Sequence, residues 1–175
     1  MTVILGIDPG SNITGYGVIE VLGNRQIYIS CGCIRVSQGA SLSSRLADIY
    51  KGIQMVYEEF KPQEAAIERV FMHQNPSSAL KLGQARGVAM VVLGLHQIPV
   101  SEYSPREVKQ AVVGYGAAEK EQVQHMVKTL LSLSKKPQAD AADALAIALC
   151  HGVSRSMMSQ LQQHLQGKKK GEITS

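Results

Sequence analysis

Four acidic residues occupy positions from which they could share a buried metal site. Asp8 and Glu68 each end a short apolar run, and Asp140 and Asp143 lie three apart in a segment rich in alanine and leucine. Carboxylates in apolar surroundings are costly unless something neutralises them. Apart from Arg69, these segments contain no Lys or Arg. Hard oxygen ligands of this kind indicate Mg²⁺, with Mn²⁺ as a substitute.

Each acid taken alone has an ordinary structural explanation. Asp8 could cap a turn, Arg69 could pair with Glu68, and Asp140 could be a helix N-terminal acid favoured by the dipole. Asp143 is the hardest to explain in this way, because Ala and Leu surround it. The combination is the stronger signal, since four converging carboxylates cannot all stay ionised without cations. Two Mg²⁺ ions about 3.5–4 Å apart are a known arrangement for in-line displacement at phosphorus, so we expect two ions per site.

The elements that must position these acids form a mixed α/β pattern. The sequence predicts strands over residues 3–8, 15–22, 26–36, 64–70 and 99–103, and helices over 41–60, 76–95, 105–114, 117–133 and 138–151. We expect a sheet of about five strands with helices on both faces. Ligands gather at the carboxyl ends of parallel strands, where Asp8 and Glu68 would converge.

Composition and charge fit one intracellular domain. The 175 residues, 45% of them hydrophobic, suffice for a single core, which we place at residues 1–153. Residues 154–175 are polar and predict a marginal helix and a flexible tail. The three cysteines, Cys31, Cys33 and Cys150, have no disulfide-framework or zinc spacing, and no signal peptide or membrane span is predicted, so we expect a cytoplasmic protein.

The net charge allows two interpretations. It is only +4, but four of the fourteen acids are assigned to the metal site, so the remaining surface is more basic. Such a distribution suits a polyanionic substrate read through bound metal. A slightly basic surface without any such role explains the net charge equally simply.

Several motifs together resemble the RuvC family of Holliday-junction resolvases, from about residue 2 to residue 152. The resemblance is carried by residues 6–10 with 14–17, 66–71, 79–87 and 138–146. Other ribonuclease-H-like proteins and the actin-like kinases have a motif similar to the first one. The segment 81–87 and the final aspartate pair are the specific part.

The resemblance implies a ribonuclease-H-like fold and Mg²⁺-dependent, paired nicking of four-way DNA junctions in recombination and repair. It also implies a homodimer with two active sites and a branch-migration motor made of two other proteins. Asp8, Glu68, Asp140 and Asp143 match the catalytic acids, Lys109 and Lys120 match basic residues that serve DNA binding and catalysis, and Phe71 matches an aromatic that contacts bases near the crossover. Arg69 departs from the pattern, which has a neutral residue there.

Further DNA contacts and the dimer surface are predicted from the residues themselves. Lys81 and Arg86 could hold phosphate, and Arg69 is a further candidate DNA contact. Gly83 and Gly87, four apart, put small residues on one helix face. That face could serve a dimer contact, which would suit a nearly two-fold junction, or it could pack closely on the sheet.

Rival functions remain open at this point. A ribonuclease H that acts on RNA–DNA hybrids would use similar acids. An actin-like kinase would need a second phosphate-binding lobe, for which 175 residues leave no room. A non-catalytic junction-binding module is the third rival, and the intact acidic set argues against it.

Overall fold

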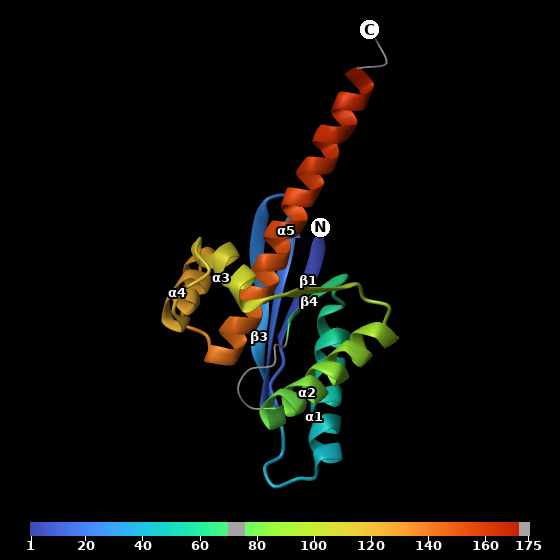
Figure 1. Ribbon diagram of the computed structural model, residues 1–175, viewed down its shortest axis with the longest axis vertical. Coiled ribbons are helices and arrows are strands. Elements are labelled where there is room, and N and C mark those ends of the chain that lie inside the picture. The colour runs from blue at the N-terminus through green and yellow to red at the C-terminus, as the bar shows by residue number, and fades with distance from the viewer. Residues whose placement is uncertain (70–75, 172–175) are drawn as a thin grey trace.

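A five-stranded mixed sheet forms the centre of the molecule (Figure 1). The computed structural model describes residues 1–69 and 76–171, with side chains as far as residue 161. The strands are β1 (Thr2–Asp8), β2 (Ile13–Leu22), β3 (Arg25–Arg35), β4 (Glu64–Glu68) and β5 (Val100–Tyr103). Their order is β3-β2-β1-β4-β5, with β1–β2 and β2–β3 antiparallel and β1–β4 and β4–β5 parallel. The predicted mixed sheet is confirmed.

Helices cover both faces of this sheet. They are α1 (Leu42–Phe60), α2 (Pro76–Leu95), α3 (Pro105–Val113), α4 (Lys120–Leu130) and α5 (Ala139–Gly171). Side chains alternate across a strand, so Leu5 and Ile7 of β1 pack with α1 and α2, while Ile4 packs with α3, α4 and α5. The sheet is therefore buried on both sides, as its nearly continuous apolar runs predict.

Two glycines let α5 lie directly on the backbone of the central strands. A Cβ atom added at Gly6 of β1 would stand 2.1 Å from the carbonyl oxygen of Ala144, and one added at Gly15 of β2 would stand 2.0 Å from that of Asp140. No side chain fits in that space. The close approach brings the first turns of α5, with their two aspartates, onto the end of β1.

The C-terminal helix is longer than predicted. We expected the core helix to end at residue 151 and a separate marginal helix to follow from residue 154, but α5 continues without a break to Gly171 and projects beyond the body of the molecule (Figure 1). No proline follows His151, and the Met, Gln, Leu and Lys residues after it are good helix formers. The division into a domain of residues 1–153 and a flexible tail stays a prediction.

The predicted helix starts can be compared where the structure describes them. Ser104 followed three residues later by Glu107 is typical of a capping box, and the two residues form one at the start of α3. Asn75, which directly precedes Pro76 and is therefore a candidate N-cap, lies outside the described residues, as does the predicted strand end Val70. No helix within the described ranges combines the length and apolar character needed to cross a membrane.

Candidate active site

Asp8 and Glu68 leave the sheet side by side. β1 and β4 are parallel neighbours, and the last residue pair in register is Ile7 with Ile67, directly before the two acids. Both carboxylates therefore sit at the same edge of the sheet, where parallel strands place ligands. The sequence predicts that these two strands are neighbours, and the structure confirms it.

Asp140 and Asp143 reach the same edge from α5. Burial, the largest cause, and the charges of Glu68, Asp143 and Asp140 together raise the pKa of Asp8 to about 8, against a smaller lowering by Lys120. Burial and Asp143 likewise raise the pKa of Glu68. All four predicted acids are thus close enough to interact through their charges, and Asp8 is the most strongly affected. A cluster that so disfavours its own ionisation needs positive charge.

Two lysines supply part of that charge. The Nζ atom of Lys120 lies 2.8 Å from Oδ2 of Asp143, and this hydrogen bond raises the pKa of Lys120. Lys109 and Lys120 line a hollow of about 200 Å³ together with Glu68 and Asp143. The two lysines named by the family resemblance therefore lie beside the predicted acids.

The donor set fits a hard divalent cation in its chemistry. Four carboxylates provide oxygen ligands, and the raised pKa of Asp8 marks a group that a cation would stabilise in its charged form. Within the described residues, however, no three His, Cys, Asp or Glu side chains are already arranged to hold a metal ion. One of the four donors, Asp143, is paired with the ammonium group of Lys120.

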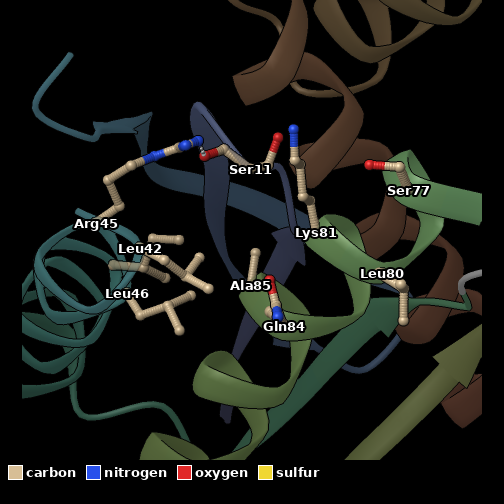
Figure 2. A pocket seen from close by; sticks show the side chains of 10 residues that line it. Ser11, Leu42, Arg45, Leu46, Ser77, Leu80, Lys81, Gln84 and Ala85 are labelled. Carbon is tan, nitrogen blue, oxygen red and sulfur yellow. Dashed lines mark hydrogen bonds between the residues drawn. The ribbon is translucent and has the colours of Figure 1, made fainter. Parts of the chain in front are cut away.

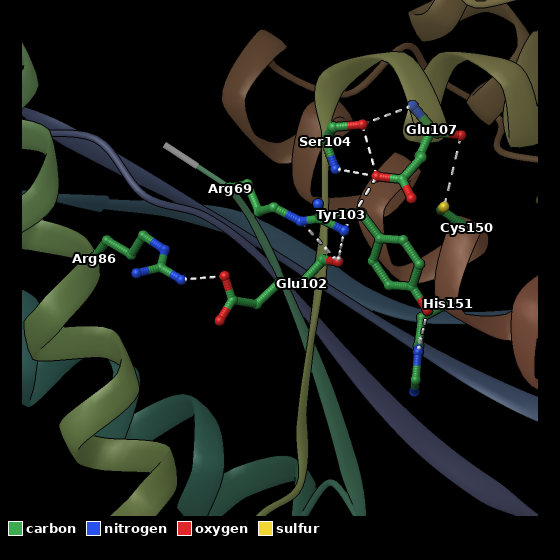
Figure 3. A network of polar contacts seen from close by, with 8 residues as sticks. All are labelled: Arg69, Arg86, Glu102, Tyr103, Ser104, Glu107, Cys150 and His151. Atoms are coloured by element: carbon green, nitrogen blue, oxygen red, sulfur yellow. Dashed lines mark hydrogen bonds and ion pairs between the residues drawn. The ribbon is translucent and has the colours of Figure 1, made fainter. Parts of the chain in front are cut away.

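The two predicted DNA-contacting arginines are paired with acids (Figure 3). Arg69 lies 3.4 Å from Glu107 and donates to the backbone oxygen of Glu102, so it does not take the role of partner to Glu68. Arg86 pairs with the carboxylate of Glu102. Contacts of these arginines with DNA stay predictions, as does that of Phe71, which lies outside the described residues.

The turn after Asp8 is held by residues that sequence reasoning missed. Thr14, fully buried, donates its hydroxyl to the carbonyl oxygen of Gly10 at 3.2 Å. Arg45 of α1 donates to the backbone oxygen of Ser11 and, at 2.8 Å, to Oδ1 of Asn12. Only the fold brings Arg45 to this turn, so spacing in the sequence gives no signal for it.

Comparison with known proteins agrees with this arrangement. The family model described as crossover junction endodeoxyribonuclease RuvC matches residues 4–151. The RuvC proteins of Legionella pneumophila (strain Corby) and Tolumonas auensis are 58% identical over 161 residues and 56% identical over 173 residues. These alignments cover 92% and 99% of this chain, and the same shares of the two relatives.

Solved structures give the same result. RuvC of Thermus thermophilus in complex with a Holliday junction has a TM-score of 0.84 and 34% identity, covering 90% of this chain and 96% of that one. The yeast mitochondrial Holliday junction resolvase Ydc2, at 15% identity and a TM-score of 0.64, shares the fold, covering 95% of this chain and 85% of its own. The expected ribonuclease-H-like fold is confirmed by the likeness. The chain belongs to the RuvC family of crossover junction endodeoxyribonucleases.

Proposed function

We propose that this chain resolves four-way (Holliday) DNA junctions by paired, metal-dependent hydrolysis of phosphodiesters in recombination and repair. The observation that carries the proposal is that Asp8, at the end of a central strand, has three acidic neighbours whose charges raise its pKa: Glu68, Asp140 and Asp143. Relatives named crossover junction endodeoxyribonuclease match nearly the whole chain, and a solved relative is bound to a Holliday junction. Both findings support a junction as the substrate.

The four acids are the proposed metal ligands, with Mg²⁺ as the ion, Mn²⁺ as a substitute and two ions per site. Such a pair, when bound, activates water and stabilises the leaving oxygen of an in-line displacement. Asp8 is the most rigidly held ligand, because β1 is paired on both sides. The ion pair between Asp143 and Lys120 must break before both oxygens of Asp143 can bind a metal ion. Because Lys120 is exposed, breaking this pair costs little free energy.

Lys109 and Lys120 position the substrate phosphate in this proposal. Their hollow is walled by apolar side chains, among them Val108 and Val123. The two ammonium groups give this hollow positive charge, which suits contact with a phosphodiester. Lys81 contributes a further phosphate contact, and Phe71 is the proposed stacking partner of an unpaired base.

A homodimer is the second part of the proposal, with the outer face of α2 as the contact. Leu80, Val91 and Leu95 on this helix are 68%, 56% and 66% exposed. A Cβ atom added at Gly83 or Gly87 would meet no described atom within 4 Å, so these glycines do not serve helix-on-sheet packing within the protomer. Exposed apolar residues beside small ones suit close contact with a second copy of the chain.

Membership of the family supports a proposal for the remaining partners and the location. We propose that the enzyme works with a branch-migration motor of two other proteins in the cytoplasm. The cysteines of the described residues are free thiols, in keeping with a reducing compartment.

The deciding experiment is cleavage of a synthetic four-way junction with and without Mg²⁺, beside an RNA–DNA hybrid and a linear duplex. We expect symmetric nicks in the junction only, and only with the metal. Cutting of the hybrid alone would favour a ribonuclease H. Binding of the junction without any cutting in Mg²⁺ or Mn²⁺ would favour the non-catalytic module.

A further inference from the structure

Two hollows meet at the β1–β2 turn, away from the hollow that contains Lys109 and Lys120. The first, about 420 Å³, lies between α1 and α2 and is lined by Ser11, Arg45 and Lys81 (Figure 2). The second, about 480 Å³, is lined by Asn12, Arg35 and Arg45. Arg45 lines both, so the hollows are neighbours that share one side chain. Together they form what we term the basic groove, which follows the turn directly after Asp8.

The cations of the basic groove are not neutralised by acids in the described part of the chain. Arg45 donates to Ser11 and Asn12, and Arg35 donates to the side-chain oxygen of Gln138 at 3.1 Å; these acceptors are all uncharged. None of the described ion pairs includes Arg35, Arg45 or Lys81. The positive charge of the groove is therefore free for an anion.

One acid lies beside the groove without pairing with its cations. Asp48 of α1 accepts a hydrogen bond from the backbone N–H of Ser37, which lines the second hollow. This bond leaves the carboxylate charged, but Asp48 forms none of the described ion pairs and so occupies none of the three cations. By contrast, the arginines Arg69 and Arg86 near β5 each face a glutamate.

The shape of the groove favours a chain-like anion over a small one. Lys81 and Arg35 line different hollows, and Arg45 lies at their junction. In Figure 2 the side chains of Arg45 and Lys81 reach toward Ser11 from α1 and α2, with Leu42 and Leu46 nearby. A nucleic-acid strand has charge at regular intervals and apolar sugar and base surface between the charges, which matches cations separated by an apolar wall.

We propose that Arg35, Arg45 and Lys81 bind successive phosphates of the substrate strand on one side of the cut, while Lys109 and Lys120 hold it on the other. The proposal rests on the proposed function and adds the path of the strand beyond the active site. Gln138 supports it, because the partner of Arg35 lies two residues before Asp140 and so ties the groove to the acids.

The salt dependence of junction binding tests the groove. Each phosphate contact contributes about 0.7–0.9 to the slope of log K against log salt. Arg35→Gln and Lys81→Gln should each lower the steepness by about that amount, and the double variant by about 1.5. Lys51→Gln, an exposed lysine on α1 outside both hollows, is the matched control. Slopes equal to that of the control would overturn the proposal.

Arg45 needs a separate design because it also holds the turn that follows Asp8. Arg45→Lys keeps the charge and should keep the slope, whereas Arg45→Gln should lose about 0.7–0.9 of it. A junction with one uncharged methylphosphonate at the contacted position should bind wild type more weakly but Arg45→Gln no more weakly. Equal slopes for the two variants, or a methylphosphonate effect that is the same in both proteins, would contradict the phosphate contact.

Failure of the groove and failure of the proposed function give different results. If wild type does not cut the junction in Mg²⁺, the function is wrong, whatever the slopes show. If wild type and Lys51→Gln cut it and the groove variants keep the full slope, only the groove is wrong.

Discussion

Lys120 and Asp143 form an ion pair in the candidate active site, with 2.8 Å between Nζ and Oδ2. The lysine side chain is 55% exposed and the aspartate 25%. Exposed pairs of this kind contribute only about 0–1 kcal/mol, so the pair is easily exchanged. Lys120 therefore neutralises one of the four acids until a stronger cation competes for it.

This pair predicts opposite effects of Lys120→Gln on metal binding and on cleavage. Without the competing ammonium, the Mg²⁺ concentration for half-maximal thermal stabilisation should fall, by up to about fivefold for a pair worth about 1 kcal/mol. Cleavage at saturating Mg²⁺ should fall as well, because the phosphate loses a positive partner. Lys128→Gln, also on α4, is the control. A higher Mg²⁺ requirement in Lys120→Gln would contradict this role.

Asp8→Asn should abolish cleavage in Mg²⁺ and leave junction binding intact. In EDTA the same variant should be more stable than wild type, because burial and three neighbouring acids oppose the charge of Asp8. We expect a gain on the order of 1–3 kcal/mol, seen as a rise in Tm of about 2–4 °C per kcal/mol.

Asp48→Asn is a matched control with the opposite expected sign. A backbone hydrogen bond from Ser37 lowers the pKa of Asp48, so its charge is favourable and its loss should slightly lower Tm. Cleavage by Asp8→Asn at the wild-type rate would show that the metal assignment is wrong. A lower Tm for Asp8→Asn in EDTA would show that its carboxylate has a structural role.

Glu64 predicts a pH-dependent contribution to stability at the opposite end of β4. Burial raises the pKa of Glu64, but hydrogen bonds from Arg155 and His151, each 2.8 Å long, lower it by more than burial raises it. The pKa of Glu64 is therefore below its ordinary value of 4.5. Because the pKa of Glu64 is lower in the folded than in the unfolded protein, its charge stabilises the fold at pH values above the unfolded-state pKa. This stabilisation is lost as pH falls through the folded-state pKa. Glu64→Gln should cost on the order of 1 kcal/mol at pH 7.

The measurement for Glu64 is urea unfolding of wild type and variant across pH. The difference in free energy of unfolding should narrow as pH falls below 4.5, the ordinary pKa of this group. Glu59→Gln, an exposed position on α1, should show no such trend. A difference that stays constant down to pH 3 would mean that the two hydrogen bonds do not depend on the charge of Glu64.

The sequence was sufficient for those parts of the site that depend on local pattern. Apolar runs that end in Asp8 and Glu68 predict two strands, and parallel pairing then brings the acids together. Contacts between distant segments had no such signal: Arg45 meets the turn at Ser11 across 34 positions, and Arg35 meets Gln138 across 103. Such contacts depend on how the helices pack on the sheet, and the spacing of residues along the sequence does not predict that packing.

The end of α5 shows a second kind of limit. Helix ends are predicted from stop signals, and the change to polar composition after His151 was interpreted as the end of the core helix, before a marginal helix from residue 154. Composition alone does not end a helix, because Gln, Met and Lys retain high helix propensity in water. The helix therefore continues as far as Gly171, although its apolar contacts with the sheet end earlier.

Gly87→Gln tests whether the outer face of α2 is the dimer contact. Within the protomer the new side chain meets no described atom at its Cβ, and a Gly-to-Gln change in a helix interior favours the helix by up to about 1 kcal/mol. If the outer face of α2 is exposed to solvent, the variant should be more stable than wild type and should associate as wild type does. If α2 packs against a second copy, the added side chain should weaken association at least about tenfold, an effect of about 1.4 kcal/mol. Sedimentation over a concentration series separates the two outcomes, with Ala47→Gln, at an exposed position of α1, as the control. Unchanged association of Gly87→Gln would rule out this dimer face.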